Sequence, residues 1–402
     1  MTSRTAAADP AAPQVAARPR GGLARTRLGR AVNLAEVRAA ARASLPRPIF
    51  EIIDGGHGDD LTRRANRAAF DQVLLRPRIL EDVATVDTRT TVLGESASMP
   101  VLLAPCSFAR LCDPGAERAV ARSADAAGIE YVVPGGSSDL PEEVATAGGS
   151  LWYQIYLKQD QGVNAELVAR VATAGYRALC VTVDTPGQPF RETDVRNRMS
   201  VPVTITPRLL GLGVRHPRWA RHFVLGNRSA GFSLTAARTS VQRFTQTIGA
   251  LRPVTATDVA WLRSVWSGPL VIKGVLRPED VDRLIDLGVD AVVVSNHGGR
   301  NLDTTPTSLA VLPEVVERVA GRAEVLLDGG VRRGADVVKA LALGARAVLV
   351  GRPYLFGLAA GGEAGVTRVL DLLRNELVST MRFVGASSIE RIDAELVRSE
   401  GS

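Results

Sequence analysis

The sequence of 402 residues is poor in lysine, cysteine and aromatic residues, and each scarcity excludes a class of protein. Only three of its 49 basic residues are lysines, and aromatic residues make up 4% of the chain. Its three cysteines have no metal-ligand spacing, which argues against a disulfide framework and favours a reducing, cytoplasmic location. No apolar run is long enough to cross a bilayer, so an integral membrane protein is not expected.

The excess positive charge is concentrated at the N-terminus. Residues 1–30 contain six arginines and a single acid, Asp9, a net +5 that leaves +2 of the total +7 for the rest of the chain. A nearly balanced body gives no indication of nucleic-acid binding. The tail is rich in Ala, Pro and Arg and lacks the apolar segment of a secretory signal. We therefore expect residues 1–30 to be disordered, with a transit peptide as the alternative.

Beyond the tail, apolar runs alternate with stretches of helical periodicity. A helix is expected at 33–44, followed by a turn-rich bend at 50–60. The runs that we interpret as strands are 101–104, 129–133, 151–157, 178–183, 270–273, 291–294, 324–327 and 346–350. Helical stretches are expected at 114–127, 141–147, 163–174, 277–287, 309–320 and 332–343. This alternation predicts an α/β fold over residues 31–392, a closed (β/α)8 TIM barrel, with a doubly wound open sheet as the alternative.

The connection between the fourth and fifth expected strands is much longer than the others. It spans about 85 residues, whereas loops in such units usually have roughly 2–6. Its segment 200–228 is rich in Pro and Gly, and we expect a mobile lid there. Residues 208–225 mix arginines with Leu, Trp and Phe, so a peripheral membrane contact is an alternative to a soluble lid.

Polar side chains follow most of the expected strands, at the end of a barrel where active sites are found. The most informative stretch is Ser295–Asp303, in which His297 stands three residues before Arg300. A titratable base beside a planar guanidinium suits proton abstraction from an anionic substrate. The other strand ends carry Gln154, Tyr156, Thr182, Asp184, Lys273, Asp328–Gly334, Gly351 and Arg352.

The loops after the last two strands predict a phosphate site. Gly-rich turns that open helices direct main-chain N–H groups at a common point, and Arg332 and Arg352 add positive charge. Neither a Walker nor a Rossmann glycine pattern occurs in a fitting place, which disfavours nucleoside triphosphates and nicotinamide cofactors. No metal is expected.

Together these motifs resemble those of the FMN-dependent α-hydroxy acid oxidases and dehydrogenases, such as glycolate oxidase, lactate oxidase and mandelate dehydrogenase. The resemblance covers about residues 33–392 and rests on Thr182–Pro186, Arg191–Asp194, Ser295–Asp303, Asp328–Gly334 and Gly351–Arg352. It implies a flavoprotein oxidoreductase that passes electrons from a small-molecule 2-hydroxy acid to FMN and then to oxygen, a quinone or a protein. It also implies a homotetramer. The insert's His216–Trp219 is similar to the membrane-associated mandelate dehydrogenases.

The resemblance implies roles for individual residues as well. His297 would take a proton from the substrate, and Asp184 would stabilise the imidazolium. Arg300 and Arg191 would bind the substrate carboxylate, with Tyr156 facing the reacting carbon. Lys273 would stabilise the negative charge of the reduced flavin. The other cofactor contacts would come from Pro105, Cys106, Ser107, Gln154, Thr182, Ser295, Asp328, Gly329, Gly330, Arg332, Gly351 and Arg352.

The sequence departs from the family pattern at two positions near the expected substrate. Phe50-Glu51-Ile52 stands where relatives usually carry Tyr-Asp-Tyr, and Gly136 lies in a stretch where glycolate oxidase carries a tryptophan. If Ile52 and Gly136 border the substrate, these exchanges enlarge the pocket and favour a 2-hydroxy acid bulkier than lactate. The alternatives are oxidation of an unusual alcohol or amine in a biosynthetic pathway, and a flavin-binding barrel without catalysis.

Overall fold

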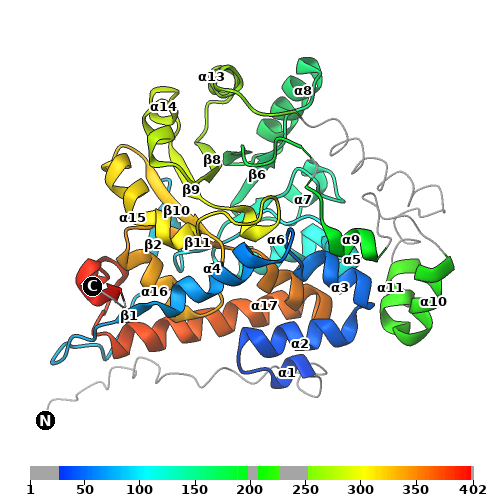
Figure 1. Cartoon of the computed structure of the whole chain (residues 1–402), viewed down its shortest axis with the longest axis horizontal. Coiled ribbons are helices and arrows are strands. Elements are labelled where there is room, and N and C mark those ends of the chain that lie inside the picture. The colour runs from blue at the N-terminus through cyan, green and yellow to red at the C-terminus, as the bar shows by residue number, and fades with distance from the viewer. Residues whose placement is uncertain (1–26, 188, 198–206, 226–251, 400–402) are drawn as a thin grey trace, which may run out of the picture.

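The computed structural model describes residues 27–187, 189–197, 207–225 and 252–399. Eight parallel strands close into a barrel in the order β10-β11-β4-β5-β6-β7-β8-β9, with helices around it (Figure 1). The expected TIM barrel is thus confirmed, and the open sheet is wrong. The barrel strands are β4 (Val101–Leu103), β5 (Tyr131–Val133), β6 (Leu151–Ile155), β7 (Ala178–Thr182), β8 (Leu270–Val275), β9 (Ala291–Val294), β10 (Glu324–Asp328) and β11 (Ala347–Val350).

Each expected helical stretch contains a helix of the outer layer. The helices that follow barrel strands are α6 (Ala116–Ala127), α7 (Pro141–Ala145), α8 (Gln161–Thr173), α13 (Ala256–Val265), α14 (Val281–Asp286), α15 (Ser308–Val319), α16 (Gly334–Ala342) and α17 (Arg352–Phe383). Short helices in the loops are α5 (Ala109–Cys112), α9 (Glu192–Arg196), η2 (Pro278–Asp280) and η3 (His297–Gly299). Helix α17 bends at Gly361 and Gly362, whose backbones are not helical.

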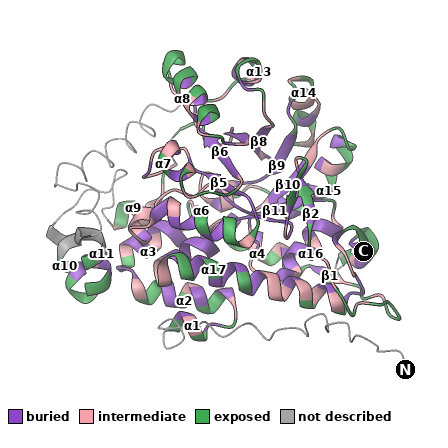
Figure 2. Cartoon of the chain, turned by 180° about the vertical axis from the view of Figure 1, so that it is seen from behind, coloured by how far each residue is buried: buried purple, intermediate pink, exposed green. Residues whose placement is uncertain are grey.

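The barrel is a packed core because its strand residues alternate between two apolar clusters. In β9, for example, Ala291 and Val293 point into the barrel, whereas Val292 and Val294 pack against the outer helices. The buried strands stand out at the centre of the molecule in Figure 2. The same alternation turns Lys273 inward, because it lies two residues after the inward-facing Val271 of β8.

A two-stranded hairpin closes the end of the barrel opposite the strand C-termini. It consists of β2 (Thr90–Val92) and β3 (Glu95–Ala97), and Val92 and Ala97 join the apolar cluster inside the barrel. The Glu324 carboxylate accepts the N–H of Leu93 in the turn, at 3.0 Å. Arg177 pairs with Glu95. These contacts fix the hairpin by its turn as well as by its apolar face.

Four helices precede the barrel: α1 (Arg27–Arg30), α2 (Leu34–Ser44), α3 (Arg47–Asp54) and α4 (Leu61–Asp71). Leu28 of α1 is buried, so the last four residues of the expected disordered tail are helical; residues 1–26 lie outside the described residues. The turn-rich bend at 50–60 is wrong for residues 50–54, which belong to α3. Pro48 falls in the first turn of that helix, where the missing N–H costs nothing.

The C-terminal segment runs back over the barrel through η4 (Ile389–Arg391), η5 (Ala394–Leu396) and β12 (Val397–Ser399), which pairs with β1 (Val73–Leu75). The ordered structure therefore extends beyond residue 392. Of the expected lid at 200–228, the described part forms α10 (Pro207–Arg215) and α11 (Pro217–Leu225), beside α9 in Figure 1; its remaining residues lie outside the described ranges. Within the described ranges, every helix is too short or too polar to cross a membrane.

Candidate active site

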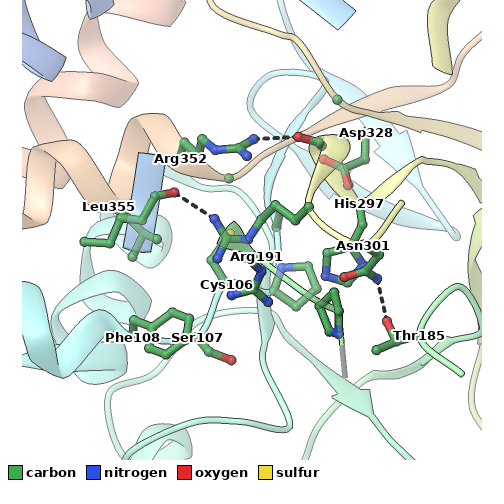
Figure 3. A pocket seen from close by; sticks show the side chains of 18 of the residues that line it. Cys106, Ser107, Phe108, Thr185, Arg191, His297, Asn301, Asp328, Arg352 and Leu355 are labelled. Carbon is green, nitrogen blue, oxygen red and sulfur yellow. Dashed lines mark hydrogen bonds between the residues drawn. The ribbon is translucent and has the colours of Figure 1, made fainter. Parts of the chain in front are cut away.

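A cavity of about 340 Å³ opens at the C-terminal ends of the barrel strands (Figure 3). Fourteen of the predicted site residues line it: Pro105, Cys106, Ser107, Tyr156, Arg191, Lys273, His297, Arg300, Asp328, Gly329, Gly330, Arg332, Gly351 and Arg352. The other four are Gln154, Thr182, Asp184 and Ser295, which sit at or just after the ends of barrel strands. The topology therefore gathers residues from seven strand ends at one site.

His297 and Asp184 form the titratable pair of this site. The imidazole Nδ1 lies 2.9 Å from Asp184 Oδ1. Burial acts to raise the pKa of Asp184, but the facing His297 and Lys273 outweigh it and hold the pKa below its usual range. Asp184 thus stays an anion and fixes one ring nitrogen, which leaves Nε2 to face a ligand. His297 itself has φ +56, a left-handed backbone conformation that costs free energy in a residue with a Cβ. Such conformations cluster at functional sites.

Beside this pair, the backbone of β8 passes very close to Asp184. Gly274 of β8 has φ +114, and a Cβ there would lie 2.6 Å from Asp184 Cβ. Asn301 donates to the Asp184 carbonyl at 3.0 Å and to the Thr185 hydroxyl at 2.8 Å. Asn301 lines the cavity and lies within the Ser295–Asp303 motif, but sequence reasoning assigned it no role. Its place in the motif was the available signal.

A second buried ion pair lies deeper in the barrel. Lys273 Nζ is 2.7 Å from Asp328 Oδ2, and the Ser295 hydroxyl bridges the two, 2.9 Å from Lys273 Nζ and 2.8 Å from Asp328 Oδ2. Burial works against the ammonium, yet the carboxylates of Asp328 and Asp184 raise the pKa of Lys273 above its ordinary value. Lys273 is therefore a fixed cation at the floor of the cavity.

Two half-buried arginines donate hydrogen bonds to main-chain carbonyls. Arg300 donates to the carbonyls of Ile52, Ile53 and Gly55 at 2.9–3.1 Å, and Arg352 to those of Gly298 and Gly55 at 2.9–3.0 Å. The C-terminal end of α3, whose carbonyls carry partial negative charge, thus orients both guanidinium groups. Three of the five N–H donors of Arg300 are used, and two remain for a ligand.

These cations are not neutralised by nearby acids. Burial, and then the charges of Arg191 and Arg352, lower the pKa of Arg300 well below its ordinary value. Burial and Arg352 lower that of Arg332 to about 10. Guanidinium groups that are partly buried and repel one another are stabilised when an anion binds between them. The site is therefore suited to anionic ligands.

Arg191 and Tyr156 complete the polar wall. Arg191 lies 3.2 Å from Asp194 Oδ2, and its Nε is buried without a partner in the described structure. Burial raises the pKa of Tyr156 to about 12, so its phenol stays protonated and can donate a hydrogen bond.

One premise of the predicted phosphate site is wrong. The N–H groups at the start of α16 are not available to a ligand in the cavity, because Asp336 accepts from the amides of Arg332 and Arg333 at 2.7 and 2.9 Å. Glu376 accepts from the amide of Gly334 at 3.0 Å. The positive charge at this end of the cavity comes from side chains instead. Those side chains belong to Arg332 and Arg352, as predicted.

The two positions expected to enlarge the pocket also need correction. Ile53 lines the cavity, whereas Ile52 is buried and contributes its carbonyl to Arg300. Gly136 is buried and is not part of the cavity wall. The sequence analysis assigned no role to several apolar residues that border the cavity, because none of its motifs contains them. They are Ile53, Phe108, Phe190, Val195 and Leu355.

Known proteins resemble this chain over most of its length. Residues 41–399 match the family model described as FMN-dependent dehydrogenase. The L-lactate oxidase of Nostoc sp. is 41% identical over 378 residues, covering 92% of this chain and 99% of that protein. A crystal structure of mandelate oxidase is 36% identical with a TM-score of 0.79, covering 92% and 98% of the two chains. The structure of the monotopic membrane protein (S)-mandelate dehydrogenase is 33% identical with a TM-score of 0.86, covering 92% and 100%.

The chain belongs to the FMN-dependent dehydrogenase family. It is an FMN-dependent oxidoreductase that acts on the CH–OH group of 2-hydroxy acids. The cavity fits FMN, because Arg352 Nε in its wall is buried and has no partner among the described residues, so it can donate to a ligand. Arg332 and Arg352 supply the charge that a phosphate needs, and Lys273 supplies a cation where the flavin would carry negative charge.

Proposed function

We propose that this enzyme oxidises 2-hydroxy acids bulkier than lactate, with His297 as the base. The observation that supports it most directly is the His297–Asp184 pair, 2.9 Å apart, in a cavity that combines arginines with apolar side chains. FMN, when bound, supplies the acceptor for the two electrons taken from the carbinol carbon. The protein residues bind, orient and deprotonate the substrate.

The proposed roles follow from where each group lies. Arg191 and the two unused donors of Arg300 bind the substrate carboxylate, which places the carbinol beside His297. His297 Nε2 takes a proton from the substrate, and the ionised Asp184 stabilises the imidazolium that results. The Tyr156 phenol donates to the carbinol oxygen. Lys273 presents a fixed positive charge to the flavin side of the cavity.

The preference for a bulky acid rests on the apolar wall. Phe190 and Val195 are 64% and 57% exposed at the cavity, and Phe108, Ile53 and Leu355 border it from other elements. A substrate with an aryl or long alkyl group would cover these side chains, which is favourable by about 25 cal/mol per Å² of apolar surface. A methyl group would leave most of them in water. The similarity to mandelate oxidase supports the same direction.

Anaerobic reduction of the bound flavin tests the proposal. The panel is mandelate, a long-chain 2-hydroxy acid, lactate and glycolate, together with benzyl alcohol and benzylamine, which lack the carboxylate. We expect mandelate or the long-chain acid to exceed lactate in kcat/KM by at least about tenfold. Glycolate or lactate as the best substrate would contradict the preference for bulk. Faster reduction by the alcohol or the amine would contradict the role of the two arginines.

Two further properties concern the surface of the molecule and its assembly. We propose that α10 and α11 contact lipid, because Val214 is 82% exposed beside the exposed Arg215 and Arg218. Co-sedimentation with phosphatidylglycerol vesicles tests this, and Val214→Asp should reduce it. We also propose a homotetramer. Light scattering of the purified holoenzyme decides that point.

A further inference from the structure

Trp219 of α11 connects the long insert to the wall of the cavity. Its side chain is 6% exposed, and the indole N–H donates to the carbonyl of Leu111 at 2.9 Å. Leu111 lies in α5, a single helical turn that follows the cavity loop 104–108 directly. The insert joins the barrel by a directional bond at this point, and Leu212 and Ala220 add apolar contacts with the core.

Phe108 begins this turn in a conformation that needs support. Its φ is +75, in the left-handed region that residues with a Cβ seldom adopt. Its carbonyl accepts from the Leu111 amide at 3.0 Å and from the Cys112 thiol at 3.6 Å. Leu111 thus links the two residues, because its carbonyl accepts from the Trp219 indole and its amide donates to the Phe108 carbonyl. The side chain of Phe108 lines the cavity (Figure 3).

We propose that Phe108 is the residue that selects aryl over small 2-hydroxy acids and that Trp219 positions it. The proposal deepens, and rests on, the proposed preference for bulky substrates. A ring on the substrate would pack against the Phe108 ring, whereas a methyl group would not reach it. The side chain can offer that surface only while α5 keeps Phe108 in the left-handed conformation. The insert therefore shapes specificity through the hydrogen bond from Trp219 to Leu111.

Because α5 has other contacts, we expect loss of the Trp219 hydrogen bond to loosen the turn rather than to unfold it. Arg110 forms an ion pair with Asp139, so the turn is held on a second side. Loss of the Trp219 donor leaves that pair and the Cys112 contact in place. We therefore expect the turn to loosen and the FMN site to remain intact.

The test uses the FMN-loaded full chain with Trp219→Phe and Phe108→Leu. Trp266→Phe is a matched control, because Trp266 is 5% exposed and donates its indole N–H to the Pro269 carbonyl at 3.0 Å, away from the cavity. Binding of benzoylformate and pyruvate is followed by the change in flavin absorbance. Turnover of mandelate and lactate is measured alongside. Amide hydrogen exchange over residues 108–113 reports on the turn directly.

Phe108→Leu should weaken benzoylformate binding by about two- to tenfold and leave pyruvate within twofold. Trp219→Phe should shift the same ratio by a smaller factor and speed exchange over residues 108–113, while Trp266→Phe changes neither. Equal weakening of both ligands, or a Trp219→Phe enzyme that behaves like the control, would overturn the proposal. If wild-type enzyme shows no preference for mandelate but the variants still weaken benzoylformate alone, the proposed preference for bulky acids fails, while the contact of Phe108 with an aryl ring and its support by Trp219 stand.

Discussion

The two ends of the barrel treat arginine in opposite ways. At the hairpin end, Arg177 pairs with Glu95, and Arg263 combines the Asp290 carboxylate at 3.0 Å with main-chain carbonyls. At the cavity end, Arg300 and Arg352 are bound to carbonyl oxygens, and Arg332 donates to the Val331 carbonyl. In the described part of the chain, no carboxylate lies within ion-pairing distance of these three.

The difference separates cations that stabilise the fold from cations kept for a ligand. A guanidinium whose donors all meet partners is satisfied within the protein. Arg191 is intermediate, because it pairs with Asp194 but its Nε has no partner in the described structure. Guanidinium groups that bond only to carbonyls have no carboxylate to balance their charge, and desolvation lowers the pKa of Arg300, Arg332 and Arg352. Such an arrangement costs stability until an anion binds. The cavity end is thus prepared for the FMN phosphate and the substrate carboxylate.

The largest expected effect comes from removing the base at the cavity end. His297→Gln should retain FMN, because the Lys273–Asp328 pair and the arginines are untouched, and should lose ~10²–10⁴-fold in the rate of flavin reduction. Stopped-flow reduction by the best substrate measures it. His57→Gln is the control, since His57 does not line the cavity. Flavin reduction at the parental rate in the His297 variant would show that another group takes the proton.

Removing the cation at the barrel floor should have the next largest effect. Lys273→Met leaves the buried Asp328 carboxylate without its partner, which typically costs about 3–5 kcal/mol in a buried pair. We expect weaker FMN binding and a lower free energy of unfolding. Lys339→Met provides the control, because Lys339 donates to the Phe70 carbonyl and lies outside the cavity. Equal losses in both variants, measured by FMN titration and urea unfolding, would refute a special role for Lys273.

The sequence predicted the barrel and most of the site because both depend on local signals. Each buried strand is an apolar run, and each strand end places its next polar residues at one face, so Lys273, His297 and Asp328 could be located. What could not be predicted depends on contacts distant in sequence. Arg300 reaches carbonyls almost 250 residues earlier, and Ile53 rather than Ile52 faces the cavity because the segment is a helix. Phe108 carries no motif and enters the wall through its backbone conformation.

Arginine geometry gives a third prediction that compares the two ends directly. Arg300→Lys removes a planar group whose donors reach three carbonyls, and an ammonium cannot satisfy all three and a carboxylate as well. We expect KM to rise and kcat to fall, with a loss in kcat/KM of about 1.5–3 kcal/mol. Arg263→Lys removes a similar set of carbonyl contacts at the other end.

The Arg263 variant should lower the melting temperature and leave KM unchanged. The reverse pattern, with KM changed by Arg263→Lys and unaffected by Arg300→Lys, would break the distinction between the two ends.

The last expected effect concerns acids and is confined to stability, and it asks whether the two ends differ in burial or only in the placement of cations. Burial raises the pKa of Glu117, near the cavity end, to about 7, with Asp139 adding to the rise. Burial also raises the pKa of Glu130, near the hairpin end, to about 7. A folded-state pKa above the ordinary value of 4.5 means that stability is complete below pH 4.5 and falls as the pH rises towards 7. The rise from 4.5 to about 7 is about 2.5 pKa units, so at about 1.4 kcal/mol per unit each carboxyl costs up to about 3.5 kcal/mol above pH 7. Glu117→Gln and Glu130→Gln should therefore each stabilise the protein at pH 8 and leave it nearly unchanged at pH 5, as read from urea unfolding at the two pH values. Because the sites are separate, the double variant should show the sum.

A similar gain at both ends would mean that burial acts alike on acids throughout the barrel and that only the unneutralised arginines distinguish the cavity end. A gain at pH 5 as large as at pH 8 would show that neither glutamate titrates in this range.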